Sequence, residues 1–190
     1  MSTNKGDADL DKIKTLRSMT GAGLMNCKEA LKLKNGNIDD AVQYLKEKGL
    51  ALANKKSSRV AKEGRIESYI HHNSRIGVLV EVNCETDFVA QTDELKAFAK
   101  EVALQVAAND SLRYVSYEDL NEDEINKLKI DLGLVDSDKG SNEKLKECFL
   151  LDQTSLKNSS QTIKDRLQQA IAKLGENIKI ARFVRFELGQ

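Results

Sequence analysis

Apolar side chains in the N-terminal part of the chain recur every three or four positions, which is the spacing of amphipathic helices. Three such stripes follow one another, at residues 10–16, 24–31 and 38–45. Asn37 stands where a cap at the start of the third helix is expected, and Gly49 stands where that helix is predicted to end. The pattern predicts a compact three-helix module over residues 1–52.

The next stretch, residues 53–65, is rich first in Ala and then in cations. These cations are Lys55, Lys56, Arg59, Lys62 and Arg65. Such a charge run predicts a solvated basic linker, and a phosphate-binding patch is the alternative.

The remainder of the chain mixes two periodicities. Three segments alternate as strands: residues 66–72, 75–85 and 179–188. Four segments have helical spacing: residues 95–106, 122–134, 142–150 and 163–174. The pair Asn73-Ser74 is a fair hairpin turn between the first two strands. These elements predict an α+β core over residues 66–190, in which helices pack a small antiparallel sheet.

The segment after the second strand changes character abruptly. Glu85, Thr86 and Asp87 form a polar break, and the aromatic Phe88 follows at once. Thr and Asp favour the start of a helical turn because their side chains bond its free N–H groups. Two interpretations follow: Phe88 is an ordinary buried aromatic, or the turn holds it outward as a contact for another protein.

Composition limits the classes of function. The chain has 190 residues, of which 40% are hydrophobic and 32% charged, as is typical of a globular protein. Residues 1–65 hold 14 Lys and Arg against 8 Asp and Glu, a net charge of +6, and residues 66–190 hold 16 against 22, a net charge of −6. Such a division can orient a protein partner, but it lacks the dense basic face of a nucleic-acid binder.

Targeting signals are not evident. No apolar run approaches the roughly 20 residues that a transmembrane helix needs, so no membrane contact is expected. Residues 1–9 contain no apolar signal core, and their Asp residues argue against an Arg-rich transit peptide. The cytoplasm is the expected location; an organellar matrix or stroma is expected instead if a presequence has been removed.

Residues with catalytic chemistry are few. His71 and His72 are the only histidines, and as neighbours on a strand they are expected to point to opposite faces. Residues 20–23 (TGAG) lack the preceding strand and the following Lys-Ser/Thr of a phosphate loop. We therefore expect no enzymatic activity and no cofactor.

The three cysteines have neither metal-ligand nor disulfide spacing. They are Cys27, Cys84 and Cys148. The first two fall on apolar faces and are expected to be buried thiols, so no metal site is predicted.

Several motifs carry, in their order and spacing, a resemblance to one family. They are residues 16–31 (LRSMTGAGLMNCKEAL), 35–41 (NGNIDDA), 45–51 (LKEKGLA), 55–64 (KKSSRVAKEG), 83–90 (NCETDFVA) and 182–189 (RFVRFELG). In them the chain resembles elongation factor Ts, the guanine-nucleotide exchange factor for elongation factor Tu in bacteria and organelles. The resemblance implies an N-terminal module of the ubiquitin-associated type, a linker and an α+β core of the dimerisation type.

The resemblance also implies which residues meet the GTPase. Thr86, Asp87, Phe88 and Val89 are expected to reach its nucleotide domain, where the Phe wedges between helices and disturbs Mg²⁺ coordination at the bound GDP. The N-terminal module is expected to dock through Arg17, Thr20, Gly21, Ala22, Gly23, Met25 and Lys28.

A second class of function stays open at this point. A non-catalytic adaptor would use the helical module to bind ribosomal or ubiquitin-like partners, and it would have no need of the segment 86–89.

We also expect a homodimer, because the chain has material for one core half where long family members resemble two. The candidate interface is the alternating segment Ile180, Arg182, Val184, Phe186 and Leu188. A strand inside its own sheet is the alternative interpretation of that segment.

Overall fold

The structure is a computed structural model that describes residues 5–134 and 141–189. The prediction that residues 1–9 contain no signal peptide falls partly on residues 1–4, which lie outside the described residues. The described chain divides into two compact units. One combines Met1–Val60 with Gln168–Asn177, and the other combines Ala61–Leu167 with Ile178–Gln190. The predicted domain limits 1–52, 53–65 and 66–190 stay a prediction.

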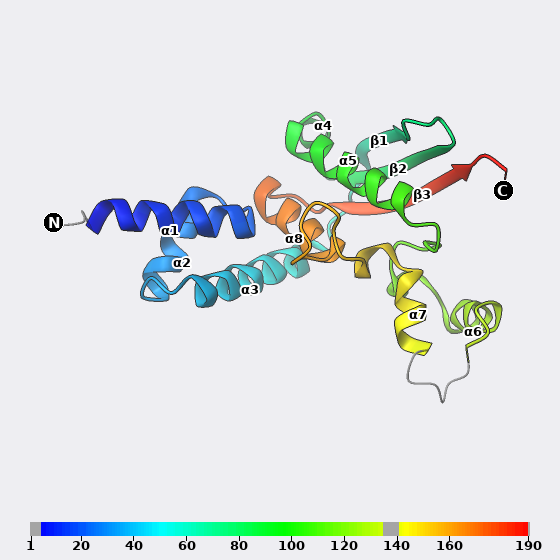
Figure 1. The fold of residues 1–190 in the computed structure, drawn as a ribbon. Helices are drawn as coiled ribbons and strands as arrows, with labels where there is room; N and C mark the ends of the chain where they lie inside the picture. The colour runs from blue at the N-terminus through cyan, green and yellow to red at the C-terminus, as the bar shows by residue number, and fades with distance from the viewer. Residues whose placement is uncertain (1–4, 135–140, 190) are drawn as a thin grey trace. The chain divides into compact units, whose positions relative to one another are not determined.

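The first unit contains the three helices that the apolar stripes predicted, together with the C-terminal part of α8 (Ile163–Leu174). The three predicted helices are α1 (Lys5–Thr20), α2 (Leu24–Leu33) and α3 (Ile38–Lys56) (Figure 1). Side chains from all three helices form one buried cluster: Ile13, Leu16, Cys27, Ala30, Leu31 and Ala41. The assignment of this module to the ubiquitin-associated type stays a prediction.

The end of α3 differs from the sequence-based prediction. The helix starts as predicted, with the Asn37 side chain accepting a hydrogen bond from the Asp40 N–H. However, it runs through Gly49 and ends only at Lys56. A glycine inside a helix costs about 1 kcal/mol relative to Ala and does not by itself end it. The following residues, Ala51 to Ala53, are good helix formers, and Ala53 is buried, so the helix continues.

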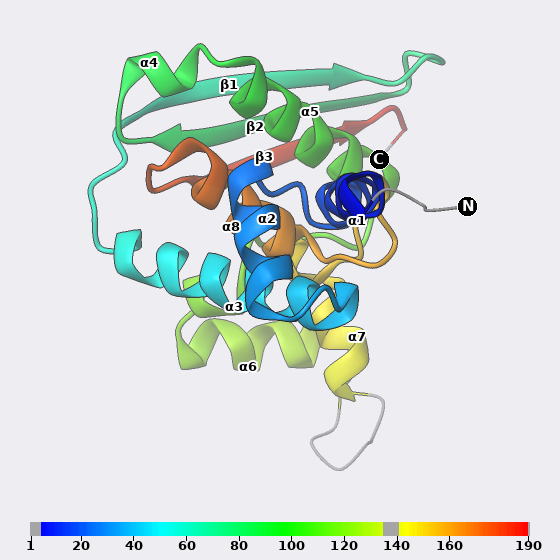
Figure 2. The same ribbon diagram turned by 90° about the vertical axis from the view of Figure 1, so that its left-hand side faces the viewer.

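The second unit contains a three-stranded antiparallel sheet in the order β1-β2-β3. The strands are β1 (Glu63–Ile70), β2 (Ile76–Cys84) and β3 (Lys179–Glu187), which lie side by side in Figure 2. The small antiparallel sheet and the α+β class are therefore confirmed. β2 lies in the centre, so β1 and β3 are the edge strands.

A bulge in β3 determines the face of the sheet on which the first side chains of this strand lie. Glu81 pairs with Arg182, whereas the next residue, Val82, pairs with Ile180, so Ala181 is an extra residue in β3. Such a bulge changes the face on which the following side chains lie. Ile180 is consequently buried, while Val184 is exposed.

Two helices cover one face of the sheet. α4 (Asp87–Ala90) and α5 (Asp93–Ala108) follow β2 directly and lie along β1 and β2 (Figure 2). The covered face supplies the buried side chains Val78, Val80 and Val82, to which α5 adds Leu95, Phe98 and Val102. The predicted helix over residues 95–106 is thus confirmed.

The rest of the second unit is made of short helices. They are η1 (Tyr117–Asp119), α6 (Glu122–Asp131), α7 (Ser141–Glu147), η2 (Leu150–Asp152) and the start of α8 (Ile163–Leu174). The predicted helices around residues 122–134 and 142–150 are confirmed in shorter form. Leu128, Leu145, Cys148 and Phe149 share a buried cluster there.

A buried ion pair fastens α8 to α5. The Arg166 guanidinium donates from Nε and Nη2 to the two carboxylate oxygens of Glu101, at 2.8 and 2.9 Å. This hydrogen bonding with Glu101 raises the pKa of Arg166 above its usual value. Ser155 donates a further hydrogen bond to Glu101 at 3.0 Å, so the carboxylate is well satisfied despite its burial.

Candidate protein-contact site

The helical turn α4 presents Phe88 to solvent. Phe88 is 83% exposed, whereas Ala90, two residues later, is 3% exposed and Cys84, at the end of β2, is fully buried. Phe88 is therefore not a core aromatic, which decides between the two interpretations of its sequence. Among the other predicted contact residues, Asp87 is exposed, and Thr86 and Val89 are half-buried.

Two threonines close this short helix at its ends. Thr86 is the N-cap, and its hydroxyl oxygen accepts a hydrogen bond from the Val89 N–H at 3.4 Å. The Thr92 hydroxyl donates to the Val89 carbonyl at 2.8 Å and accepts from the Leu95 N–H at 3.2 Å. The single side chain of Thr92 thus bonds the last turn of α4 and caps the N-terminus of α5.

Two residues from the sheet also hold the backbone of this turn. The Cys84 thiol donates to the Thr86 carbonyl, with 3.1 Å between sulfur and oxygen. From the neighbouring strand β1, Arg65 donates from Nη1 to the Ala90 carbonyl at 3.4 Å. A helix this short has little stability of its own, so such contacts with the sheet and the flanking chain set the position of Phe88.

Arg65 corrects one part of the basic-linker prediction. It lies in β1, on the sheet face that α4 and α5 cover, and not in a solvated linker. Its guanidinium also pairs with the carboxylate of Glu67 at 2.9 Å, and the two side chains are only 21% and 16% exposed. Residues two apart in a strand lie on the same face, which explains how this pair forms.

The turn between α1 and α2 holds the other group of predicted contact residues. Thr20 is only 5% exposed, and its hydroxyl donates to the Leu16 carbonyl at 2.7 Å and accepts from the Ala22 N–H at 3.3 Å. Gly21 adopts φ = +66°, a conformation that favours glycine. The side chain of Thr20 therefore shapes the turn from inside, and Ala22 packs against the buried cluster of the module.

The outward side chains of this turn are both apolar and basic. Met25 is 72% exposed and Leu24 is 54% exposed on the first turn of α2. Arg17, Gly23 and Lys28 are exposed as well. The two groups of predicted contact residues, 17–28 and 86–89, belong to different units.

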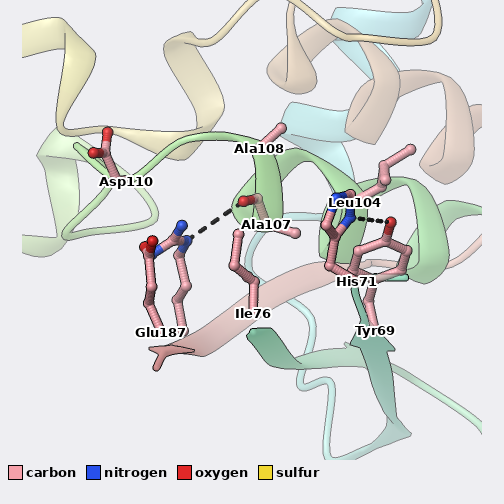
Figure 3. Close-up of a pocket in the computed structure, with 9 residues that line it drawn as sticks. Tyr69, His71, Ile76, Leu104, Ala107, Ala108, Asp110 and Glu187 are labelled. Atoms are coloured by element: carbon pink, nitrogen blue, oxygen red, sulfur yellow. Dashed lines mark hydrogen bonds and ion pairs between the residues drawn. The ribbon is translucent and has the colours of Figure 1, made fainter. Parts of the chain in front are cut away.

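The histidines do not behave as predicted. β1 ends at Ile70, so His71 and His72 belong to the turn and not to the strand, and their ring centroids lie 4.2 Å apart. The opposite-face prediction was wrong because the alternation of side chains holds only inside a regular strand. The Tyr69 hydroxyl and His71 Nδ1 are hydrogen-bonded at 3.1 Å (Figure 3).

His71 lines a cleft of about 390 Å³ (Figure 3). The cleft lies at the end of the sheet where β1 turns into β2, whereas α4 follows the opposite end of β2. Ala107 and Leu104 of α5 contribute its apolar lining, and Arg185 and Glu187 of β3 contribute charge. Arg185 bonds Glu187 at 2.6 Å and the Ala107 carbonyl at 3.5 Å.

The remaining reactive side chains are enclosed. Cys27, Cys84 and Cys148 are buried and form no disulfide, and burial raises the pKa of both the Cys27 and the Cys148 thiol. No cluster of three metal-ligating side chains occurs within residues 5–134 and 141–189. In the same part of the chain, no helix combines the length and apolarity needed to cross a bilayer.

Sequence reasoning missed two residues of the α4 site. Thr92 had a usable signal, because a Thr followed by Asp93 and Glu94 is typical of a helix start. Arg65 had none, since its backbone acceptor at Ala90 lies 25 positions away in the chain.

These features describe an α+β protein that displays an aromatic side chain on a turn fastened to a sheet, an arrangement suited to contact with another protein. Comparison with known proteins defines the family. The model of the family described as elongation factor TS matches residues 11–190. The chain therefore belongs to the elongation factor Ts family, whose members act as the nucleotide exchange factor for elongation factor Tu and do not catalyse a chemical reaction.

Individual relatives agree with this assignment. The chain is 49% identical to the chloroplastic elongation factor Ts of Pyropia yezoensis, over 93% of this chain and 86% of the relative. It is 49% identical to elongation factor Ts of Carboxydothermus hydrogenoformans, over 94% of this chain and 88% of the relative. For elongation factor Ts of a Synechocystis species the identity is 46%, over the same shares.

Proposed function

We propose that this chain promotes GDP release from elongation factor Tu by inserting Phe88 into the nucleotide domain of the GTPase. The observation that carries the proposal is the exposure of Phe88, 83%, on a turn whose flanking residues Cys84 and Ala90 are buried. A large apolar side chain on a fixed turn can enter a partner pocket with little further loss of conformational entropy.

The proposed mechanism needs no covalent chemistry. Insertion of the aromatic ring shifts those elements of the GTPase that lie beside its Mg²⁺ ion. Mg²⁺ demands a near-ideal octahedral shell, so its coordination tolerates a displacement of the surrounding atoms poorly. When the coordination of Mg²⁺ is weakened, the negative charge of the GDP phosphates is no longer neutralised, and GDP leaves. Because linkage is reciprocal, the GDP form must bind this chain more weakly by the same factor, and GTP binding then displaces it.

The helical module contributes affinity in this proposal. Met25 supplies exposed apolar surface, and Arg17 and Lys28 supply positive charge beside it. The backbone at Gly21 and Gly23 lets a partner approach closely because no side chain intervenes. The proposed docking residues are those predicted from the sequence: Arg17, Thr20, Gly21, Ala22, Gly23, Met25 and Lys28.

Release of fluorescent GDP from elongation factor Tu tests the proposal. The parent chain should accelerate release, and Phe88→Ala should lower the maximal rate while keeping the thermal midpoint. Ile130→Ala is a matched control, because Ile130 is 77% exposed on α6 and its loss also removes exposed apolar surface. Equal release rates for Phe88→Ala and the parent would reject the wedge.

The same assay separates the exchange factor from the adaptor alternative. An adaptor would bind its partner and leave the rate of GDP release unchanged at every concentration. We place the activity where elongation factor Tu works, in the cytoplasm or in an organellar matrix or stroma, and it involves neither nucleic acid nor a membrane.

We further propose that the chain forms a homodimer through the open face of its sheet. This face, opposite α4 and α5, exposes one apolar side chain after another: Ile66, Ile70, Leu79, Val184 and Phe186. Ile180, which the sequence placed on this face, is instead buried on the other side because of the bulge at Ala181. Apolar patches of this kind mark protein contacts.

Light scattering at tens of micromolar tests the dimer. It should give twice the chain mass for the parent and less for Phe186→Glu; a monomer mass for the parent would reject the dimer.

A further inference from the structure

We propose that Arg65 is a positioning residue for nucleotide exchange: it clamps the C-terminal end of α4 to β1 and thereby fixes the direction in which Phe88 points. This inference rests on the proposed function of Phe88. It concerns a residue that the sequence motifs around 83–90 do not include.

The first support is the geometry of the clamp. Arg65 Nη1 donates to the Ala90 carbonyl at 3.4 Å, and Ala90 is the last residue of α4. The final carbonyls of a helix carry partial negative charge and have no partner inside the helix. A guanidinium placed there satisfies the carbonyl and attracts the end of the helix to the sheet.

The second support is that other fastenings of α4 are local. Thr86, Thr92 and Cys84 all lie within a few residues of Phe88 along the chain, whereas Arg65 comes from another strand. Local bonds define the shape of the turn, but they can move together with it. Cys84 bonds the first residues of the turn to β2, whereas Arg65 bonds the last residue of α4 to the neighbouring strand β1.

The third support is that Arg65 is an unfavourable residue for stability alone. Its Nε is buried and has no hydrogen-bond partner among the described residues. A buried donor without a partner costs free energy, and the pair with Glu67 is also largely withdrawn from water. An apolar side chain at this strand position would avoid both costs. The benefit of Arg65 therefore lies in the hydrogen bond from its Nη1 to the Ala90 carbonyl.

The chain contains a close structural counterpart to serve as control. Arg185 in β3 also pairs with the residue two positions further on, Glu187, at 2.6 Å. It also donates to a carbonyl near the end of a helix, that of Ala107 in α5, at 3.5 Å. Arg185 pairs with Val78 of β2 and lines the cleft that contains His71, at the end of the sheet away from α4.

The experiment compares Arg65→Met with Arg185→Met in the full chain. The rate of fluorescent GDP release from elongation factor Tu is measured against factor concentration. Arg65→Met should lower the maximal rate about fivefold, which is about 1 kcal/mol at 1.36 kcal/mol per factor of ten, with the half-saturating concentration nearly unchanged. Arg185→Met should leave the maximal rate unchanged. Equal losses in both variants, or a fall in proportion to the folded fraction, would overturn the proposal.

A double variant separates positioning from a general loss of structure. In the Phe88→Ala background, Arg65→Met should cause no further fall in the maximal rate, because its effect passes through Phe88. The same fold-change in both backgrounds would show that Arg65 acts independently of the wedge and would overturn the proposal.

A measurement without the GTPase distinguishes failure of the clamp from failure of the proposed function. Hydrogen exchange at the Ala90 and Gln91 amides, which bond the Thr86 and Asp87 carbonyls, should be faster in Arg65→Met than in the parent or in Arg185→Met. Unchanged exchange there rejects the clamp. Faster exchange there, together with normal GDP release by Phe88→Ala, instead rejects the wedge.

Discussion

The two turns that carry the predicted contacts are built in different ways. The turn between α1 and α2 is stabilised by its own neighbours, since Thr20 bonds Leu16 and Ala22, and the Gly21 N–H bonds the Arg17 carbonyl. The turn after β2 is stabilised locally by Thr86 and Thr92 but also across the sheet by Arg65. Both expose a large apolar side chain, Met25 or Phe88.

The difference indicates what each turn is suited to do. A surface that contributes affinity tolerates small movements, because many weak contacts share the binding free energy. The single aromatic wedge that we propose would tolerate less movement, because a misplacement of about 1 Å can cost a large factor in rate. The bond from Arg65 to the Ala90 carbonyl, which we propose as a clamp, lies at the turn for which we propose the wedge.

The largest expected effect comes from removing the wedge itself. Phe88→Ala should lower the maximal rate of GDP release at least about 30-fold, the size of an interface hot spot of about 2 kcal/mol. The free energy of unfolding should change by less than about 1 kcal/mol, since an exposed side chain contributes little to the core. Urea unfolding and stopped-flow release measure the two quantities on the same preparation.

Truncating the apolar residue of the other turn should affect a different parameter. Met25→Ala should raise the concentration for half-maximal release about tenfold, a loss of about 1.4 kcal/mol of binding. The maximal rate should stay within about twofold of the parent, because affinity alone has changed. A titration of release rate against factor concentration separates these outcomes, and a lowered maximal rate would contradict the distinction between the turns.

Removing the hydroxyl of each threonine gives a finer comparison. Thr86→Val and Thr20→Val should each cost about 1 kcal/mol of stability, through loss of a helix cap and of a buried hydrogen bond respectively. Only Thr86→Val should also slow maximal release, by a few-fold, because it loosens the turn beneath Phe88. Thermal melts and release assays on the pair test this, and equal slowing by Thr20→Val would remove the difference.

The smallest expected effect is that of salt on association. The net charge of +6 over residues 1–65 and −6 over residues 66–190 should orient the encounter with the GTPase. Raising ionic strength from low to physiological values should slow association about two- to fivefold, and leave the maximal release rate unchanged. Stopped-flow association at several salt concentrations measures this; a flat dependence would show that charge does not guide either turn.

Much of the fold was accessible from the sequence because its signals are local. The apolar spacing predicted the three N-terminal helices, α5 and α8, and the alternation predicted the three strands. The break at Glu85 to Asp87 predicted a turn, although not whether Phe88 lay inside or outside. Boundaries were less accurate, since Gly49 did not end α3.

By itself, the sequence determined the helices, the strands and the polar break from which α4 starts. Periodicity and capping depend on neighbours a few residues apart, and one sequence suffices to recognise them. Only the tertiary structure decided that Phe88 points outward, that the bulge at Ala181 buries Ile180, and that Arg65 reaches Ala90. These depend on how strands pair and how a helix lies on the sheet, which bring together residues whose separation along the chain carries no local pattern.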